Sequence, residues 1–217
     1  MGSAPDFRVP QSRAPGDVTD PAYFPVPVEK AVEFGNGKIH IIVNNVGYTW
    51  DGVLHRMTNK QWRTILTVHN TAPFRLIREA SPYFRVKDAK TRAIVNILSV
   101  AGTHGNAGQA NYSLAKAGVT GLTKTIVKEW SQVCYVYQLR TNESLLIWLN
   151  YFGVRACTIA YGGMETRLTR TREEVAFIIA PDGQRVALGI PGAQLAKVGS
   201  SATAAYGHTT PLNAQMP

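Results

Sequence analysis

The chain has 217 residues, of which 45% are hydrophobic and 17% charged, a composition that fits a single globular domain and excludes wholesale disorder. Cys134 and Cys157 are the only two cysteines, too few for a disulfide scaffold, so we expect a reducing, cytoplasmic location, with a mitochondrial one left open. No apolar run is long enough for a membrane span and no signal-peptide core is present, so we expect neither a membrane-spanning nor a secreted protein.

The formal net charge is +9, and most of the excess lies between Arg56 and Arg92, where nine basic residues accompany two acidic ones. Such a segment suits a nucleic acid, an acidic protein partner or a phosphate-bearing ligand. No zinc-ligand spacing, nucleic-acid-binding aromatic motif or tandem basic run accompanies it. We therefore expect no nucleic-acid partner and no metal site.

In chain order, residues 1–15 are rich in proline and lack periodicity, which predicts an irregular N-terminal segment. Val28 to Phe34 fits the end of a helix that Gly35-Asn36-Gly37 closes. The β-branched run Ile39–Val43 predicts a buried strand, which leads directly into Asn44-Asn45-Val46-Gly47.

The capping box Thr58-Asn59-Lys60-Gln61 predicts the start of the next helix. Apolar residues at helical spacing continue to Phe84, and Pro73 is expected to break or kink this helix. A second buried strand is predicted over Ala93–Leu98, and Ser99 follows it.

After a glycine-rich loop, the small apolar residues of Asn111–Trp130 predict a long helix, and Val154–Ala160 reads as a third strand. The alternation of strands and helices predicts an α/β fold with a parallel sheet. Residues 131–151 interrupt this rhythm, because a helix-to-strand link is normally only about 2–6 residues long. They are either translated non-coding sequence or a surface hairpin or helix whose apolar Leu145–Leu149 needs a partner surface. Residues 197–217 are predicted to form an irregular tail.

Tyr112 and Lys116 are four residues apart on one predicted helix, so their side chains share a face. A phenol normally has a pKa near about 10, and a nearby lysine cation stabilises the phenolate and lowers that pKa. Such a tyrosine can give a proton to a carbonyl oxygen or take one from an alcohol. Ser99 lies at the carboxyl end of a strand, where open α/β sheets bind ligands, and its hydroxyl could hold the same oxygen.

These motifs resemble the short-chain dehydrogenase/reductase family, and within it the 3-oxoacyl-carrier-protein reductase-like members. The matching pieces, in family order, are Asp17-Val18-Thr19-Asp20, Asn44-Asn45-Val46-Gly47, Ser99, Tyr112-Ser113-Leu114-Ala115-Lys116 and the run Phe152–Leu168. The resemblance implies a Rossmann-like doubly wound parallel sheet over residues 16–196. It also implies an oxidoreductase that uses NAD or NADP to reduce a ketone or 3-oxoacyl thioester, or to oxidise a secondary alcohol.

The resemblance assigns roles to individual residues. Tyr112 would be the general acid/base, Lys116 would bind the nicotinamide ribose and lower the pKa of Tyr112, and Ser99 would orient the substrate carbonyl. Asp17 would contact the adenine. The other residues expected along the cofactor are Val18, Asn44, Asn45, Gly47 and Thr166. The helix of Tyr112 and the helix before it imply a dimer or tetramer, and the basic segment 56–92 could receive an acidic carrier protein.

The sequence departs from the family pattern in several places. The family's first strands and glycine-rich phosphate loop do not precede Asp17, so the choice between NAD and NADP cannot be read. His69 aligns with the family's catalytic asparagine, with Asn70 beside it. Either residue could carry a proton relay, or neither does and His69 is simply a packed or exposed helix residue. Cys157 is expected to be a small buried residue. The alternative function is a catalytically silent, truncated family member that associates with related subunits.

Overall fold

The computed structural model describes residues 10–88, 90–130, 152–161, 177–179 and 183–187. These belong to two compact units, residues 1–162 and 163–217, which we describe separately. The predictions for residues 131–151, for the tail 197–217 and for Thr166 lie outside the described residues.

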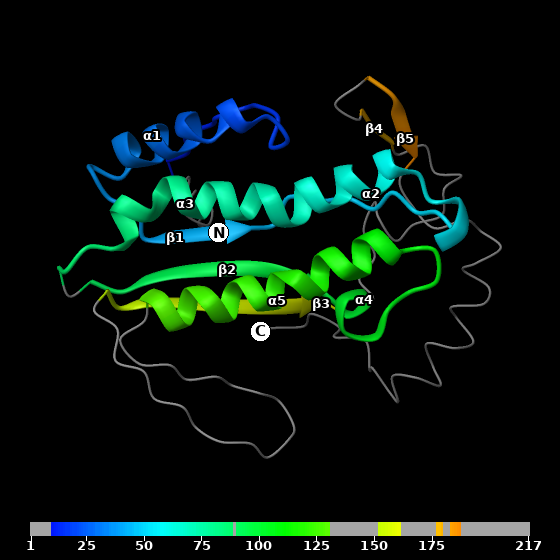
Figure 1. The fold of residues 1–217 in the computed structure, drawn as a ribbon. Coiled ribbons are helices and arrows are strands. Elements are labelled where there is room, and N and C mark those ends of the chain that lie inside the picture. Colours follow the sequence, from blue (N-terminus) through cyan, green and yellow to red (C-terminus); the bar gives the residue numbers. More distant parts are fainter. Residues whose placement is uncertain (1–9, 89, 131–151, 162–176, 180–182, 188–217) are drawn as a thin grey trace, which may run out of the picture. The chain divides into compact units, whose positions relative to one another are not determined.

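The first unit is built on a parallel three-stranded sheet in the order β1-β2-β3 (Figure 1). The strands are β1 (Ile41–Asn44), β2 (Arg92–Ser99) and β3 (Val154–Tyr161). In this register Val43, Val95 and Cys157 stand side by side. The three predicted strands are thus confirmed. The first one starts two residues later than expected and is not fully buried, since Ile41 and Val43 are exposed.

Helices connect these strands. The short helix η1 (Pro21–Tyr23) leads into α1 (Pro25–Phe34), and η2 (Leu54–Arg56) precedes α2 (Asn59–Leu66). A π-helical segment, η3 (Thr67–Thr71), joins α2 to α3 (Ala72–Phe84). The chain then forms α4 (Val100–His104) directly after β2, and the long helix α5 (Ala110–Trp130).

The α2–η3–α3 segment runs on as one helical rod rather than breaking at Pro73 (Figure 1). Its start is the predicted capping box, in which the Thr58 hydroxyl accepts from the Gln61 backbone amide and the Gln61 side-chain oxygen accepts from the Thr58 backbone amide. Pro73 has no N–H to donate, and the chain accommodates it by widening to a π-helix in the preceding turn. The predicted disturbance is therefore local, and it falls on His69 and Asn70.

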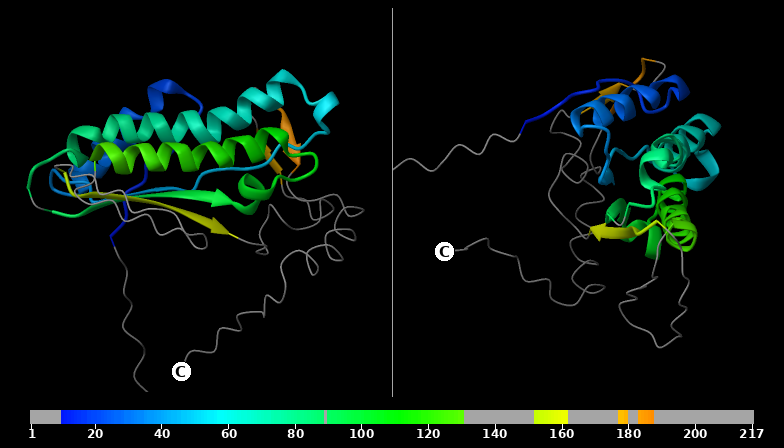
Figure 2. Two further views of the ribbon diagram at one scale, coloured as in Figure 1. Left: turned by 60° about the horizontal axis from the view of Figure 1, so that its bottom comes forward. Right: turned by 90° about the vertical axis from the view of Figure 1, so that its left-hand side faces the viewer.

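The core of this unit lies between the sheet and α1, α3 and α5. Ile42 and Ile94 of the sheet pack with Ile77 and Phe84 of α3 and Ile126 of α5. Figure 2 shows α3 and α5 running side by side along the same face of the sheet. These contacts fix α3 and α5 on the sheet.

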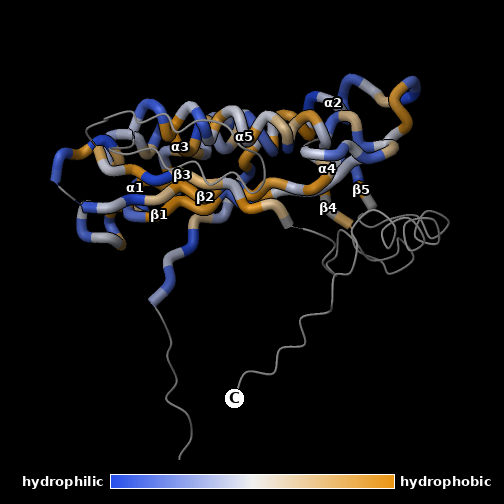
Figure 3. Tube along the Cα trace, turned by 90° about the horizontal axis from the view of Figure 1, so that it is seen from below, coloured by the Kyte–Doolittle hydropathy of each residue, from blue (hydrophilic) through white to orange (hydrophobic). Residues whose placement is uncertain are grey.

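The opposite face of the sheet is apolar but exposed within the described part of the chain. Ile41, Val43 and Ile159 expose 62%, 56% and 41% of their surfaces, and Figure 3 shows the strands as strongly hydrophobic. Cys157 lies on this face as an exposed free thiol, so the expectation that it is buried was wrong. The reason is that alternate residues of a strand point to opposite faces, and only one face is covered by described helices.

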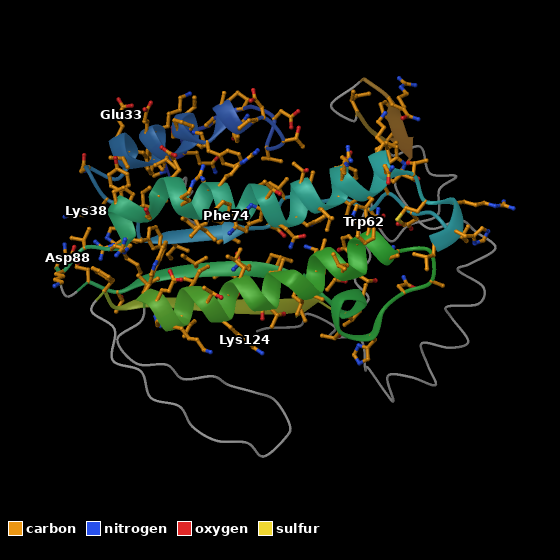
Figure 4. All side chains as sticks on the ribbon, in the orientation of Figure 1. Glu33, Lys38, Trp62, Phe74, Asp88 and Lys124 are labelled. Carbon is orange, nitrogen blue, oxygen red and sulfur yellow. The ribbon has the colours of Figure 1, made fainter. Side chains whose placement is uncertain are left out.

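A charged group lies at the amino end of β2, remote from the carboxyl ends of the strands. Arg92 is buried and makes a two-pronged bond to Asp88, with both N–O distances at 2.8 Å. Figure 4 shows Asp88 and Lys38 at this same end of the sheet. The pKa of the Asp88 carboxyl is held well below its usual range by Arg92.

In the second unit the described residues form a two-stranded antiparallel sheet. Its strands are β4 (Phe177–Ile179) and β5 (Arg185–Ala187), with Phe177 opposite Ala187. The Arg185 guanidinium lies 4.1 Å from the centre of the Phe177 ring, a cation–π contact.

Candidate active site

Tyr112, Lys116 and Ser99 come together as predicted, at the carboxyl end of β2 and the start of α5. The Lys116 Nζ lies 5.6 Å from the centre of the Tyr112 ring, since the two residues are one helical turn apart. Nζ also donates a 2.8 Å hydrogen bond to the Ile97 carbonyl, which ties α5 to β2. The ammonium is therefore held beside the phenol by the backbone of the central strand.

Ser99 connects the end of β2 to both α4 and the tyrosine. Its Oγ accepts a 3.2 Å bond from the Ala101 amide and so caps α4. The Ser99 hydroxyl also lowers the pKa of Tyr112, but burial of the phenol outweighs this effect and the net shift of the pKa is upward. The predicted lowering of the Tyr112 pKa by Lys116 is therefore not met in this structure.

Lys116 is only 6% exposed. Burial disfavours its charged form and lowers its pKa from 10.5 to about 8. Near neutral pH the group is still mainly an ammonium, with a proton that it can release easily. A buried amine of this kind beside a phenol is typical of a site where protons move.

The structure separates the roles of His69 and Asn70. The His69 ring meets the Tyr112 ring edge-on, with centres 5.1 Å apart and planes at 85°. Asn70 donates a 2.8 Å bond to the Ala115 carbonyl, which joins η3 to α5. Of the two candidates for a proton relay, only His69 contacts the tyrosine.

The loop after β1 lies against this group. His69 Nε2 is 2.8 Å from the Tyr48 carbonyl oxygen, and a Cβ added at Gly47 would collide with the His69 ring. Asn44 donates a 2.7 Å bond to Asn96, while Asn45 is exposed next to it. Asn44 thus lies at the carboxyl end of β1, and Gly47 lies against the His69 ring that contacts Tyr112.

Asp17 and Val18 lie further along the same end of β1. Asp17 accepts two 2.8 Å bonds from Thr19 within its own turn, and Val18 lines a cavity of about 130 Å³. Asn44, Val46 and Val68 line the same cavity, which is therefore mostly apolar. Thr166, the remaining predicted cofactor residue, belongs to the part of the chain that the structure leaves undescribed.

Several supporting residues were missed by the sequence reasoning. Asn96 is 1% exposed and donates a 2.8 Å bond to Thr123 on α5. Asn111 is fully buried; its amide bonds to the carbonyls of Trp50 and Gln61, and its Oδ1 accepts from the Tyr112 amide. The only sequence signal for these residues was Asn96, because an asparagine in the otherwise apolar run of β2 is buried there and its amide requires hydrogen-bond partners.

The donors and the cavity of this group match the chemistry of a nicotinamide dinucleotide. The Lys116 ammonium and the Tyr112 and Ser99 hydroxyls are donors suited to a ribose and a carbonyl, and the cavity beside Val18 suits an aromatic base. The Tyr48 hydroxyl is buried without a hydrogen-bond partner in the described structure, which is an orphaned donor at the same edge. The residues present fit the ribose and base portions of such a cofactor. No metal-binding cluster occurs among the described residues.

The family assignment follows from comparison with known proteins. Residues 9–137 match the family described as short chain dehydrogenase, and the chain belongs to this family. It is 41% identical over 113 residues to the 3-oxoacyl-acyl-carrier-protein reductase of Thermotoga maritima, covering 52% of this chain and 45% of the relative. It is 36% identical over 143 residues to the enzyme of the same name from Vibrio cholerae, covering 66% of this chain and 50% of the relative.

A solved structure supports the same fold. A short-chain dehydrogenase from Streptomyces avermitilis superposes with a TM-score of 0.56 and 26% identity, covering 70% of this chain and 48% of that one. The Rossmann-like α/β prediction is thereby confirmed. The chain spans about half the length of the curated relatives it matches. No helix in the described residues has the length and apolar character needed to cross a membrane.

Proposed function

We propose that this chain carries the acid/base centre of an NAD(P)-dependent carbonyl reductase. The observation that carries the proposal is the contact of Tyr112 with Ser99 and Lys116 at the carboxyl end of β2. The bound cofactor supplies the hydride. The Tyr112 hydroxyl gives its proton to the carbonyl oxygen, Ser99 holds that oxygen, and Lys116 stabilises the phenolate that remains.

The substrate class is a ketone or a 3-oxoacyl thioester, with the second supported by the names of the relatives. The nicotinamide and its ribose would lie between Asn44, Gly47 and Lys116. Asp17 and Val18 would hold the adenine at the apolar cavity. The choice between NAD and NADP is left to measurement, and a cytoplasmic location is part of the proposal because Cys157 is a free exposed thiol.

The test is a fluorescence titration of the purified chain with NADH and with NADPH, followed by an assay with a 3-oxoacyl thioester. Tyr112→Phe should lower turnover by about 100-fold or more, the usual contribution of a general acid, with cofactor binding largely retained. Tyr83→Phe, on α3 and packed against the core, is the matched control. A folded chain that binds neither cofactor would instead support the catalytically silent family member that acts through related subunits.

For partners we propose an acidic carrier protein at the groove between α3 and α5. Arg78, Arg85 and Lys128 line this groove, whose volume is about 590 Å³, and the two arginines stack on Phe74 and Phe152. Charge reversal at Arg78 and Arg85 should weaken binding of an acyl-carrier protein, measured by calorimetry. The same helices are proposed to form the subunit contact, so the carrier protein and a second subunit would compete for this groove, and sedimentation of the variants must accompany the titration. Weaker self-association with unchanged carrier affinity would contradict the carrier site.

A further inference from the structure

The π-helical segment η3 presents two neighbouring polar residues to two different parts of the site. Asn70 bonds to the Ala115 carbonyl and lies 3.1 Å from the position of a Cβ at Gly118, so it serves the packing of η3 on α5. His69 instead reaches the loop after β1 and the ring of Tyr112. His69 is therefore the only residue of this segment that contacts both the proposed cofactor loop and the proposed acid.

The hydrogen bond of His69 determines which ring nitrogen carries the proton. A carbonyl oxygen can only accept, so the 2.8 Å contact with the Tyr48 carbonyl requires a proton on Nε2. Burial and the nearby Lys116 charge lower the pKa of His69 to about 3, against the smaller effect of the Tyr48 bond. The imidazole is thus neutral over the physiological range, with Nδ1 unprotonated.

The His69 ring is also closely packed by its neighbours. His69 is 3% exposed, and its Cε1 and Nδ1 atoms occupy the place where any side chain at Gly47 would begin. The ring thus fills the gap between the loop after β1 and the Tyr112 ring. A buried ring packed against both has little room to rotate and carry a proton between groups.

We propose that His69 is a positioning residue, which braces the Tyr112 ring and fixes the Gly47–Tyr48 turn as a neutral donor, and is not a proton carrier. This inference rests on the proposed role of Tyr112 as the acid. The proposal gives one side chain two structural roles. The Nε2–H bonds to the Gly47–Tyr48 turn, and the imidazole ring packs against Tyr112.

Two variants separate these duties. His69→Phe retains a ring against Tyr112 but loses the donor, so cofactor affinity should fall about tenfold with kcat little changed. His69→Gln retains a donor but loses the ring, so kcat should fall about tenfold with cofactor affinity little changed. His55→Gln, at an exposed histidine of η2, is the control. Equal loss of both parameters in both folded variants, or no loss in either, would overturn the proposal.

A measurement on the unmodified chain is independent of activity. Nitrogen NMR of the histidine rings should show one neutral ring protonated on Nε2 that does not titrate between about pH 5 and about pH 8, and His69→Gln should remove that signal. A His69 ring that titrates in this range, or carries its proton on Nδ1, would refute the proposal. NMR of ring-labelled tyrosine should also show faster flipping of the Tyr112 ring in His69→Gln. If the chain reduces no carbonyl but these signals are found, the proposed function fails and the bracing role of His69 stands.

Discussion

Asn44, the last residue of β1, donates a 2.7 Å hydrogen bond to the side chain of Asn96 on β2, which lies beside it in the sheet. Asn96 passes this connection on by donating to Thr123 on α5 at 2.8 Å. The polar chain crosses the sheet-to-helix interface, where nearly every other contact is apolar. It orients the Asn44 amide at the edge where we place the cofactor.

The hydrogen bonds from Asn44 through Asn96 to Thr123 predict that Thr123→Val destabilises the protein more than Thr125→Val does. Both threonines donate to the carbonyl four residues earlier on α5, but only Thr123 also accepts from a buried asparagine. Leaving the Asn96 amide without its acceptor should cost about 1–3 kcal/mol of unfolding free energy. Urea denaturation of the two variants measures the difference, and equal losses would show that the Asn96 bond contributes nothing.

A glycine pair tests the contact of α4 with α5. A Cβ at Gly102 would lie 2.8 Å from the Lys116 carbonyl carbon and 2.9 Å from the Ala117 nitrogen, so Gly102→Ala should cost about 1–3 kcal/mol and shift the catalytic group. Gly121 on the same α5 has open space, and Gly121→Ala should stabilise the helix by about 0.5–1 kcal/mol. Thermal unfolding distinguishes the two, and a stabilising Gly102→Ala would contradict the packing.

The lowered pKa of Lys116 predicts a rise in stability at alkaline pH. Between about 8 and 10.5 the unfolded chain keeps the Lys116 proton while the folded chain has lost it, so the free energy of unfolding increases with pH across this window. The gain is at most about 3 kcal/mol. Urea titrations across this range should show the increment in the unmodified chain and its loss in Lys116→Met. If the free energy of unfolding changes equally with pH in both proteins, burial does not lower the pKa of Lys116.

Ser99 should affect the acidity of Tyr112. Because the Ser99 hydroxyl lowers the Tyr112 pKa, Ser99→Ala should raise that pKa further. Ser113→Ala is the matched control, since the Ser113 hydroxyl is buried without a partner in the described structure and lies next to Tyr112 in the chain. Ultraviolet titration of the phenols, with Tyr112→Phe subtracted to assign the signal, measures the shift. An unchanged Tyr112 pKa in Ser99→Ala would remove Ser99 from the site.

By itself the sequence determined the three parallel strands, the capped helix before Pro73, the long helix from the region of Asn111, and the meeting of Ser99, Tyr112 and Lys116. These features are local or follow from period and order, because four residues make one helical turn and the carboxyl ends of parallel strands share an edge. Only the tertiary structure shows that His69 contacts the Tyr112 ring while Asn70 bonds to the Ala115 carbonyl, that burial raises the pKa of Tyr112, and that Cys157 is exposed. Each of these depends on burial and on partners distant in the chain, and no short-range pattern records which neighbours a side chain will meet.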